Sequence, residues 1–314
     1  MNHKIKACFT EQVISQCAKY YNLSLSDLEI LGCWQNFVYG YENGIIRITH
    51  HSHRSFRQIQ EELDFILYLH NNGLSVSVPI LSPNNKYIEC VEQDDDKFYI
   101  VCFERAYGKT WIFTDESIYK IGEMTGLLHT LSRQYSKNVR HHWYNNGYLL
   151  EHKLYISDKY KMVIDNAAVL IEDIKKLPVT SYNYGLVHGD INGNNYLVDN
   201  NGEIKLFDFD ECQLDWYADD IVIQLFYYTY VFEDVYERAN YFLTHFMKGY
   251  RKYSDITKND IEIMPLLFRM RELIVFTGAC RGFNNNWDEY TQRFVNRLSL
   301  MNNPLYIDVN KLRF

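Results

Sequence analysis

The sequence predicts an α+β protein in two lobes: an antiparallel sheet with one long helix, followed by a mainly helical lobe with a small β insertion. Residues 28–50 and 86–103 are short apolar runs separated by turn residues, a pattern typical of hairpins. Residues 115–134 instead place apolar side chains at helical spacing. The chain has 314 residues, 47% of them hydrophobic, which is enough for two lobes with their own cores.

Turn residues separate the elements of the first lobe. Asn43-Gly44 is a pair suited to the positive φ of a hairpin turn, and three aspartates, 94–96, turn a second hairpin. The predicted elements are a helix at 11–20 capped by Thr10, strands at 28–32, 36–41 and 45–49, a helix at 55–70, and strands at 86–91 and 98–103.

The segment before the 55–70 helix holds three histidines, His50, His51 and His53, which form a candidate metal cluster. Their spacing in a strand-to-helix turn defines no tetrahedral site. We therefore interpret the segment as a solvated helix start, with Ser52 or Ser55 in a capping role.

The pattern of the chain changes near residues 104–110, which is the best domain boundary. We expect an N-lobe at 1–104, a hinge at 105–108 and a C-lobe at 109–314. The C-lobe is predicted to contain helices at 115–134 and 159–177, short buried strands at 184–187, 196–198 and 204–207, and an almost wholly helical segment from Trp216 to Leu300.

Charge and cysteine content exclude several classes of protein. The formal net charge is −8 with no basic run, which argues against nucleic acid as the main partner. Excess acid is compatible with a cationic substrate and equally with an ordinary surface. The seven cysteines include no Cys-x-x-Cys, which fits a reducing cytoplasm, and no window of 18 apolar residues predicts a membrane helix. Oligomeric state has no signal in the sequence.

The chemistry of the chain is concentrated in His188-Gly189-Asp190 and the residues that follow. Asn195 lies five residues after Asp190, and Asp208 thirteen residues after Asn195, a distance that a hairpin spans while returning to the same site. Asp190 is expected to orient a substrate hydroxyl, while Asn195 and Asp208 offer the oxygen ligands that Mg²⁺ prefers. His188 is expected to be structural.

Asp210 completes the run Phe207-Asp208-Phe209-Asp210. It either adds a metal ligand or makes a supporting contact to the ligands. The alternative for the whole set is a polar loop whose carboxylates only cap turns.

These motifs resemble those of the aminoglycoside phosphotransferase / choline kinase superfamily, which has a protein-kinase-like fold. Further segments are similar to the family's nucleotide loop, third strand, helix glutamate, hinge and first large helix of the C-lobe: 31–39, 45–48, 62–69, 98–108 and 122–129. The resemblance covers roughly residues 28–230. It implies that ATP (GTP is an alternative) and Mg²⁺ bind between the two lobes.

The resemblance places Arg47 where the family's third strand normally carries Lys. Arg47 is then expected to steady the α- and β-phosphates while paired with Glu62. The alternatives are a surface strand residue for Arg47 and a solvated carboxylate for Glu62, since Glu61 and Asp64 are neighbours with similar chemistry.

The remaining implied roles are less dependent on side-chain identity. The loop lacks Gly-x-Gly-x-x-Gly, so phosphate contacts would come from backbone N–H groups of residues 33–37 and from the amides of Gln35 or Asn36. The backbone of Glu104 and Ala106 would bind adenine. Asp220 would brace the catalytic loop.

The resulting function is transfer of the γ-phosphoryl group to a hydroxyl of a small molecule, such as an aminoglycoside-like antibiotic, homoserine or choline. A non-catalytic nucleotide-binding protein is the alternative. A protein kinase is disfavoured because the glycine loop, His-Arg-Asp and Ala-Pro-Glu are missing. Arg269 and Arg271 either form buried ion pairs or hold an anionic substrate group. The acceptor itself is not specified by the sequence.

Overall fold

The computed structural model describes residues 5, 8–137, 140–230, 232–283, 292 and 305–314. The chain divides into two compact units. The first contains residues 1–108 and 205–210, and the second contains 109–204 and 211–314. The C-lobe was predicted to include residues 205–210, whereas in the structure these six residues belong to the first unit.

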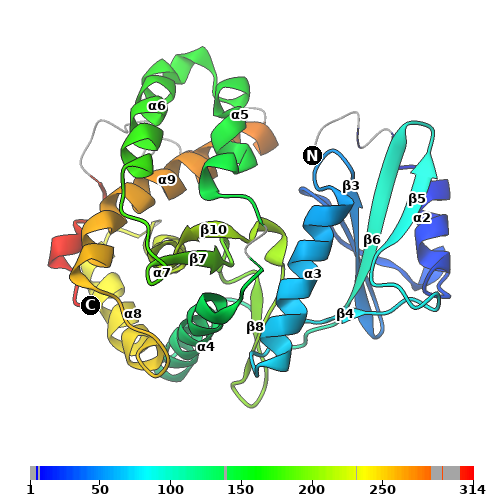
Figure 1. Cartoon of the computed structure of the whole chain (residues 1–314), viewed down its shortest axis with the longest axis horizontal. Helices are drawn as coiled ribbons and strands as arrows, with labels where there is room; N and C mark the ends of the chain where they lie inside the picture. Colours follow the sequence, from blue (N-terminus) through cyan, green and yellow to red (C-terminus); the bar gives the residue numbers. More distant parts are fainter. Residues whose placement is uncertain (1–4, 6–7, 138–139, 231, 284–291, 293–304) are drawn as a thin grey trace. The chain divides into compact units, whose positions relative to one another are not determined.

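The first unit is built on an antiparallel six-stranded sheet in the order β1-β2-β3-β6-β4, with β5 also paired to β6 (Figure 1). This arrangement is the predicted antiparallel N-terminal sheet. The strands are β1 (Glu29–Gly32), β2 (Phe37–Tyr41), β3 (Gly44–His50), β4 (Pro79–Ile80), β5 (Glu89–Gln93) and β6 (Asp96–Glu104).

Two helices, α2 (Glu11–Lys19) and α3 (Phe56–Asn71), cover opposite faces of this sheet (Figure 1). Alternation along β3 explains the arrangement, because successive strand side chains point to opposite faces. Ile46 and Ile48 pack in the core that includes residues of α2, while Arg47 between them faces α3. One strand therefore supplies both a hydrophobic core and a buried cation.

The β2–β3 turn differs from the prediction. Tyr41 pairs with Gly44, so Glu42 and Asn43 form the loop, and neither Asn43 nor Gly44 has a positive φ. A Cβ at position 44 would lie 2.5 Å from the Tyr41 ring. A side chain at position 44 would therefore require the Tyr41 ring to move.

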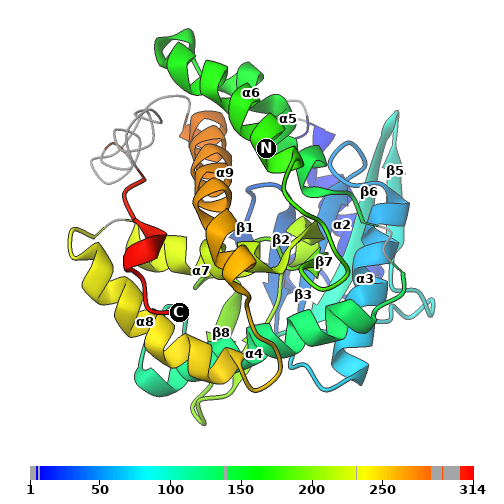
Figure 2. The same ribbon diagram turned by 60° about the vertical axis from the view of Figure 1, so that its left-hand side comes forward.

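The second unit is mainly helical, as predicted, with short strands among the helices (Figure 2). β7 and β10 form an antiparallel two-stranded sheet. The elements are α4 (Asp115–Gln134), α5 (Gly147–Tyr155), α6 (Lys161–Lys175), β7 (Tyr184–Val187), β8 (Tyr196–Val198), β9 (Ile204–Leu206), β10 (Gln213–Trp216), α7 (Tyr217–Thr229), α8 (Val235–Tyr250) and α9 (Lys258–Phe283).

Helices α4 and α8 make a close contact through glycines. A Cβ at Gly122 would lie 2.0 Å from the Phe246 carbonyl oxygen, and one at Gly126 would lie 2.4 Å from that of Tyr250. Side chains at these positions would force the helices apart. The same helix, α4, also packs against β7.

Two elements of the second unit, α5 and β10, were not predicted. The predicted helical run to Leu300 is present as α7, α8 and α9 up to Phe283; residues 284–291 and 293–304 lie outside the described residues. None of the helices described combines the length and apolar character needed to span a bilayer.

Candidate active site

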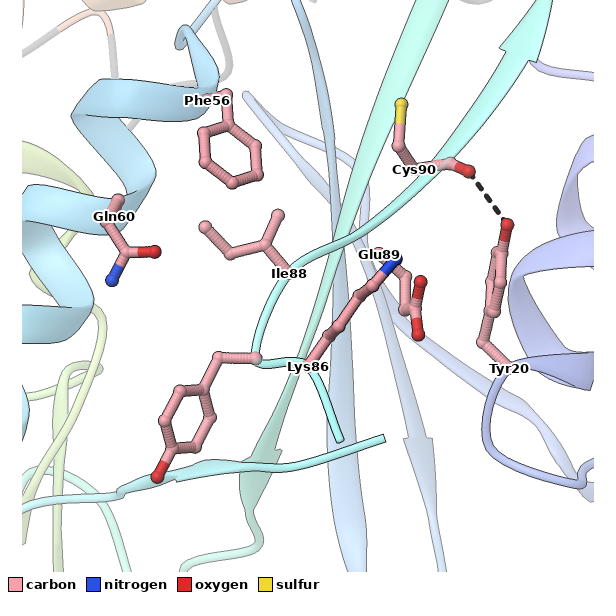
Figure 3. A pocket seen from close by; sticks show the side chains of 8 residues that line it. Tyr20, Phe56, Gln60, Lys86, Ile88, Glu89 and Cys90 are labelled. Carbon is pink, nitrogen blue, oxygen red and sulfur yellow. Dashed lines mark hydrogen bonds between the residues drawn. The ribbon is translucent and has the colours of Figure 1, made fainter. Parts of the chain in front are cut away.

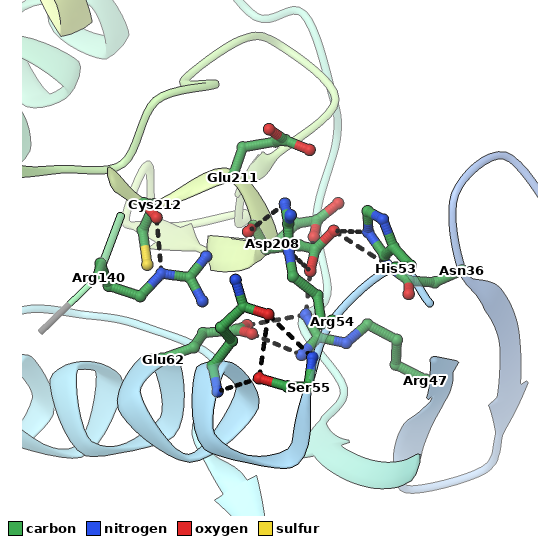
Figure 4. A network of polar contacts seen from close by, with 12 residues as sticks. Asn36, Arg47, His53, Arg54, Ser55, Glu62, Arg140, Asp208, Glu211 and Cys212 are labelled. Atoms are coloured by element: carbon green, nitrogen blue, oxygen red, sulfur yellow. Dashed lines mark hydrogen bonds and ion pairs between the residues drawn. The ribbon is translucent and has the colours of Figure 1, made fainter. Parts of the chain in front are cut away.

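A buried ion pair joins the sheet and helix α3 of the first unit. Arg47 Nη1 and Nη2 donate to Glu62 Oε1 and Oε2 at 2.8 and 2.7 Å, and both side chains are almost completely buried (Figure 4). A guanidinium matches a carboxylate in this two-bond geometry. Arg47 Nη1 also lies 4.0 Å from Asp208 Oδ1. The surface alternatives for Arg47 and Glu62 therefore do not describe this structure.

Asp210 lies in the same network and is surrounded by donors. Its carboxylate contacts His53 Nε2 at 2.7 Å, Arg54 Nε at 3.2 Å and Asn36 Nδ2 at 3.2 Å (Figure 4). Burial alone would raise the pKa of Asp210, but Arg54 and His53 outweigh it and hold the pKa well below its ordinary value. Asp208 differs, because half of its side chain, 51%, is exposed. Of these two carboxylates, Asp208 is the more exposed to solvent.

The turn that carries His53 is solvated only in part: His51, Ser52 and Ser55 are exposed as predicted, whereas His50 is buried and His53 is half-buried. His50 is buried with Nε2 2.9 Å from Asp96 Oδ1, and His53 contacts Asp210. Both carboxylates lie far from the histidines in sequence. The predicted cap is present at Ser55, whose hydroxyl accepts a hydrogen bond from the Gln58 N–H.

The residues expected to contact a nucleotide have different environments. Asn36 is buried and uses its Nδ2 on Asp210, while its Oδ1 has no hydrogen-bond partner among the described residues. Glu104 donates its N–H to the Val78 carbonyl at 2.8 Å. The Ala106 backbone makes no hydrogen bond to the described residues, so its N–H and C=O are open to a ligand. Gln35 is half-buried in the bend before β2.

A hollow of about 490 Å³ lies elsewhere on the first unit (Figure 3). Aromatic and aliphatic side chains line it together with a few charged ones, and none of the predicted site residues is among them. The lining residues are Tyr20, Phe56, Gln60, Lys86, Tyr87, Ile88, Glu89 and Cys90.

In the second unit, three side chains hold the Asp190 carboxylate in position. Its Oδ2 accepts from Asn195 Nδ2 at 2.9 Å and from Asn192 Nδ2 at 3.1 Å, and Arg271 of α9 donates to Oδ1. Asn195 also donates to the Asp190 carbonyl at 2.8 Å. Because both of these bonds leave from Nδ2, Asn195 Oδ1 accepts no hydrogen bond from the described residues and is available to a cation.

Asp220 braces the loop from α7. Its Oδ2 accepts from the His188 N–H at 3.0 Å, and its Oδ1 accepts from the Gly189 N–H at 2.9 Å. Burial alone would raise the pKa of Asp220, but His129, with Nε2 at 3.2 Å, and the loop donors keep it below its ordinary value. The His188 ring lies inside the loop and accepts from the Asp190 N–H at 3.3 Å.

The backbone conformation at Gly189 explains why this chain has His-Gly-Asp where protein kinases have His-Arg-Asp. Its φ is +78°, and an added Cβ would lie 2.5 Å from the Glu211 carbonyl oxygen. An arginine here would need a strained backbone and would collide with the segment before β10. The loop geometry thus requires the glycine that distinguishes it from the protein-kinase sequence.

The sequence left Arg271 either in a buried ion pair or on an anionic substrate group, and the structure shows an ion pair with Asp190; Asp219 had been given no role. Arg271 is buried and also contacts the Tyr227 hydroxyl at 2.9 Å and the Gly189 carbonyl at 3.3 Å. Burial raises the pKa of Asp219 to about 8, and its Oδ1 has no hydrogen-bond partner among the described residues. Arg269 instead pairs with Glu272 at 2.6 Å. A buried charge in an apolar helix was the available signal for Arg271.

The predicted site residues thus form two sets. Arg47, Glu62 and Asp208 come together in the first unit, where Asp210 supports them. The catalytic-loop set comes together in the second unit and comprises His188, Asp190, Asn195 and Asp220.

Comparison with known proteins adds independent information. Residues 35–254 match the profile of the phosphotransferase enzyme family. The chain is 31% identical over 305 residues to amicoumacin kinase of Bacillus subtilis (strain 168), covering 90% of this chain and 89% of that protein. The amicoumacin kinase hAmiN, solved in complex with AMP-PNP, Ca²⁺ and Ami, aligns with a TM-score of 0.90 at 27% identity over 99% of both chains. A microcompartment-associated aminopropanol kinase shares the fold, with a TM-score of 0.73 at 19% identity over 92% of this chain and 94% of that one.

Proposed function

Because the chain belongs to the phosphotransferase enzyme family and is a small-molecule kinase, we propose that it transfers the γ-phosphoryl group of ATP to a hydroxyl group in a Mg²⁺-dependent reaction. One observation carries the proposal: the Asp190 carboxylate is fixed by two amides and a buried guanidinium in a loop that Asp220 braces. A carboxylate held in this way can accept a hydrogen bond from an acceptor hydroxyl and orient its oxygen for attack.

The first unit is proposed to hold the nucleotide. Arg47 is assigned to the phosphates and Glu62 to fixing the guanidinium plane. Adenine is assigned to the open backbone groups of Ala106 together with the Glu104 carbonyl. Since the Asn36 amide is already used on Asp210, phosphate contacts in residues 33–37 are assigned to backbone N–H groups and to Gln35.

Asp208 and Asn195 are proposed as ligands of Mg²⁺. The donor set fits this ion, because one carboxylate is half-exposed and one amide oxygen is unused, and both are hard oxygen ligands. When bound, Mg²⁺ would neutralise phosphate charge. Asp210 is assigned a supporting role, since its carboxylate is already occupied by three side chains.

We propose amicoumacin as the first acceptor to test. The support is 31% identity over 90% of the chain to one amicoumacin kinase and a TM-score of 0.90 to another.

The test incubates the purified full chain with ATP, Mg²⁺ and a panel of amicoumacin, spectinomycin, aminopropanol, choline and homoserine. Asp190→Asn serves as the matched control, and EDTA removes the metal. The expected result is amicoumacin that has gained one phosphoryl group by mass spectrometry, absent in both controls. Phosphorylation of a different acceptor would refute the acceptor assignment, and no transfer to any acceptor would refute the proposed reaction.

A further inference from the structure

Three side chains of metal-ligand type meet at one corner of the first unit, outside the residues assigned to phosphoryl transfer. Cys8 precedes α2, His50 ends β3 and Asp96 begins β6. The Cys8 Sγ, a ring nitrogen of His50 and a carboxylate oxygen of Asp96 all lie within 4.8 Å of one another. Three segments far apart in sequence thus present sulfur, nitrogen and oxygen to one small volume.

Both ring nitrogens of His50 have partners within hydrogen-bond distance. Its Nε2 lies 2.9 Å from Asp96 Oδ1, while its Nδ1 lies 2.7 Å from the Ser52 hydroxyl. The Ser52 backbone N–H also donates to Nδ1, at 3.2 Å, so the ring proton lies on Nε2 and faces Asp96. A cation at Nε2 therefore requires this proton to move to Nδ1, where the Ser52 hydroxyl can accept it in place of the bond from the Ser52 N–H. Such an outer partner for the second ring nitrogen is the usual companion of a ligating histidine.

This cluster of three side chains is buried on the side of His50 and exposed to solvent on the side of Asp96 and Cys8. His50 is 6% exposed, and the Phe98 ring packs edge-on against it at 5.2 Å. The Asp96 side chain is 33% exposed and Cys8 is half-buried. A cation can therefore enter from solvent, while the imidazole is held by packing.

The local charge favours a cation. Asp96 follows Asp94 and Asp95 in the turn, and the neighbouring Lys97 directs its ammonium to Glu92 at 2.6 Å. Burial raises the pKa of the Cys8 thiol, and the hydrogen bond to Asp96 raises it further. A divalent ion bound here would neutralise both the carboxylate and the thiolate, and would therefore favour loss of the thiol proton.

We propose that Cys8, His50 and Asp96 bind Zn²⁺, with water as the fourth ligand. One thiolate, one imidazole and one carboxylate suit zinc, whereas Mg²⁺ and Ca²⁺ prefer oxygen alone. Binding releases the proton of the Cys8 thiol and moves the ring proton of His50 from Nε2 to Nδ1, so that His50 stays neutral. The ion ties the segment before α2 to the β3–α3 turn, which also carries His53 and Arg54, the partners of Asp210.

The test titrates the metal-free full chain with Co²⁺ as a spectroscopic probe and then with Zn²⁺. The expected result is one equivalent of Co²⁺ with thiolate charge-transfer and tetrahedral d–d absorption, displaced by Zn²⁺. Cys8→Ser abolishes the charge-transfer band, and Cys33→Ser, at an exposed cysteine, is the matched control that keeps it. No band in the unmodified chain, or an equal band in Cys8→Ser, overturns the proposal.

A second measurement needs no variant. Alkylation of Cys8 in the unmodified chain is followed by peptide mass spectrometry with and without Zn²⁺, with Cys33 as the internal reference. Zn²⁺ is expected to slow alkylation of Cys8 by at least about tenfold, because a metal-bound thiolate is protected, and to leave Cys33 unchanged. Equal slowing at both cysteines, or at neither, contradicts the site.

Discussion

The Arg47–Glu62 pair allows a sharp prediction, because its two partners are not equivalent. Removing one member of a buried ion pair costs about 3–5 kcal/mol, since the other charge is left buried without compensation. In Glu62→Gln, Arg47 keeps Asp208 at 4.0 Å and the nearby charge of Asp210. In Arg47→Met, Glu62 loses both of the hydrogen bonds that it makes to described residues.

We therefore expect Glu62→Gln near the lower end of that range and Arg47→Met near the upper end. The double variant Arg47→Met/Glu62→Leu should regain most of the stability, because apolar side chains of similar volume often replace a buried pair without loss. It should not regain ATP binding, because the double variant lacks the Arg47 guanidinium that is assigned to the phosphates.

The assay is hydrogen–deuterium exchange of β3 and α3 peptides, together with urea unfolding. Local exchange is needed because a chain of two units does not have to unfold in a single transition. The reasoning is refuted if both single variants exchange like the unmodified protein, or if the double variant is no more stable than Arg47→Met.

Three further predictions concern the second unit. Gly126→Ala should cost about 1–3 kcal/mol by urea unfolding, because its Cβ would lie 2.4 Å from a carbonyl oxygen of α8, while the control Gly147→Ala, with open space around its Cβ, should cost nothing. Asp219 has a pKa of about 8, against about 4 when unfolded, so its contribution to stability falls as pH rises through this window. Between about pH 4 and 8, the free energy of unfolding of Asp219→Asn should rise relative to that of the unmodified protein by up to about 1.4 kcal/mol per pH unit. Parallel curves of melting temperature against pH for the two proteins would contradict this. Arg271→Gln should lower kcat by about tenfold or more with the ATP Kd unchanged, because Asp190 loses a charged partner; an unchanged kcat would rule out this role.

The family and the fold class were predictable from the sequence, and the comparisons confirm both. Their signals are local: an Asp and an Asn five residues apart, and apolar spacing in α4. In the second unit, α5 and β10 were missed for an equally local reason. β10 is a four-residue strand with Gln213 and Asp215 buried, so it lacks the apolar alternation that marks a strand. α5 is a short helix whose apolar residues are partly exposed.

The errors at the site came from partners distant in the chain. His50 and His53 were expected to be solvated because the carboxylates that they contact, Asp96 and Asp210, lie 46 and 157 residues away in the sequence. The pairing of Arg271 with Asp190 spans 81 residues. Local patterns identify which residues carry charge, but only tertiary structure shows which charge meets which.

The central claim is that Asp190 orients the acceptor hydroxyl and takes no part in holding ATP. It is tested most directly by measuring kcat and the ATP Kd for Asp190→Asn. We predict a loss of at least about a hundredfold in kcat, the scale of a positioned general base, with the ATP Kd within about twofold of the unmodified protein. Equal losses in turnover and ATP affinity, or an unchanged kcat, would contradict the account.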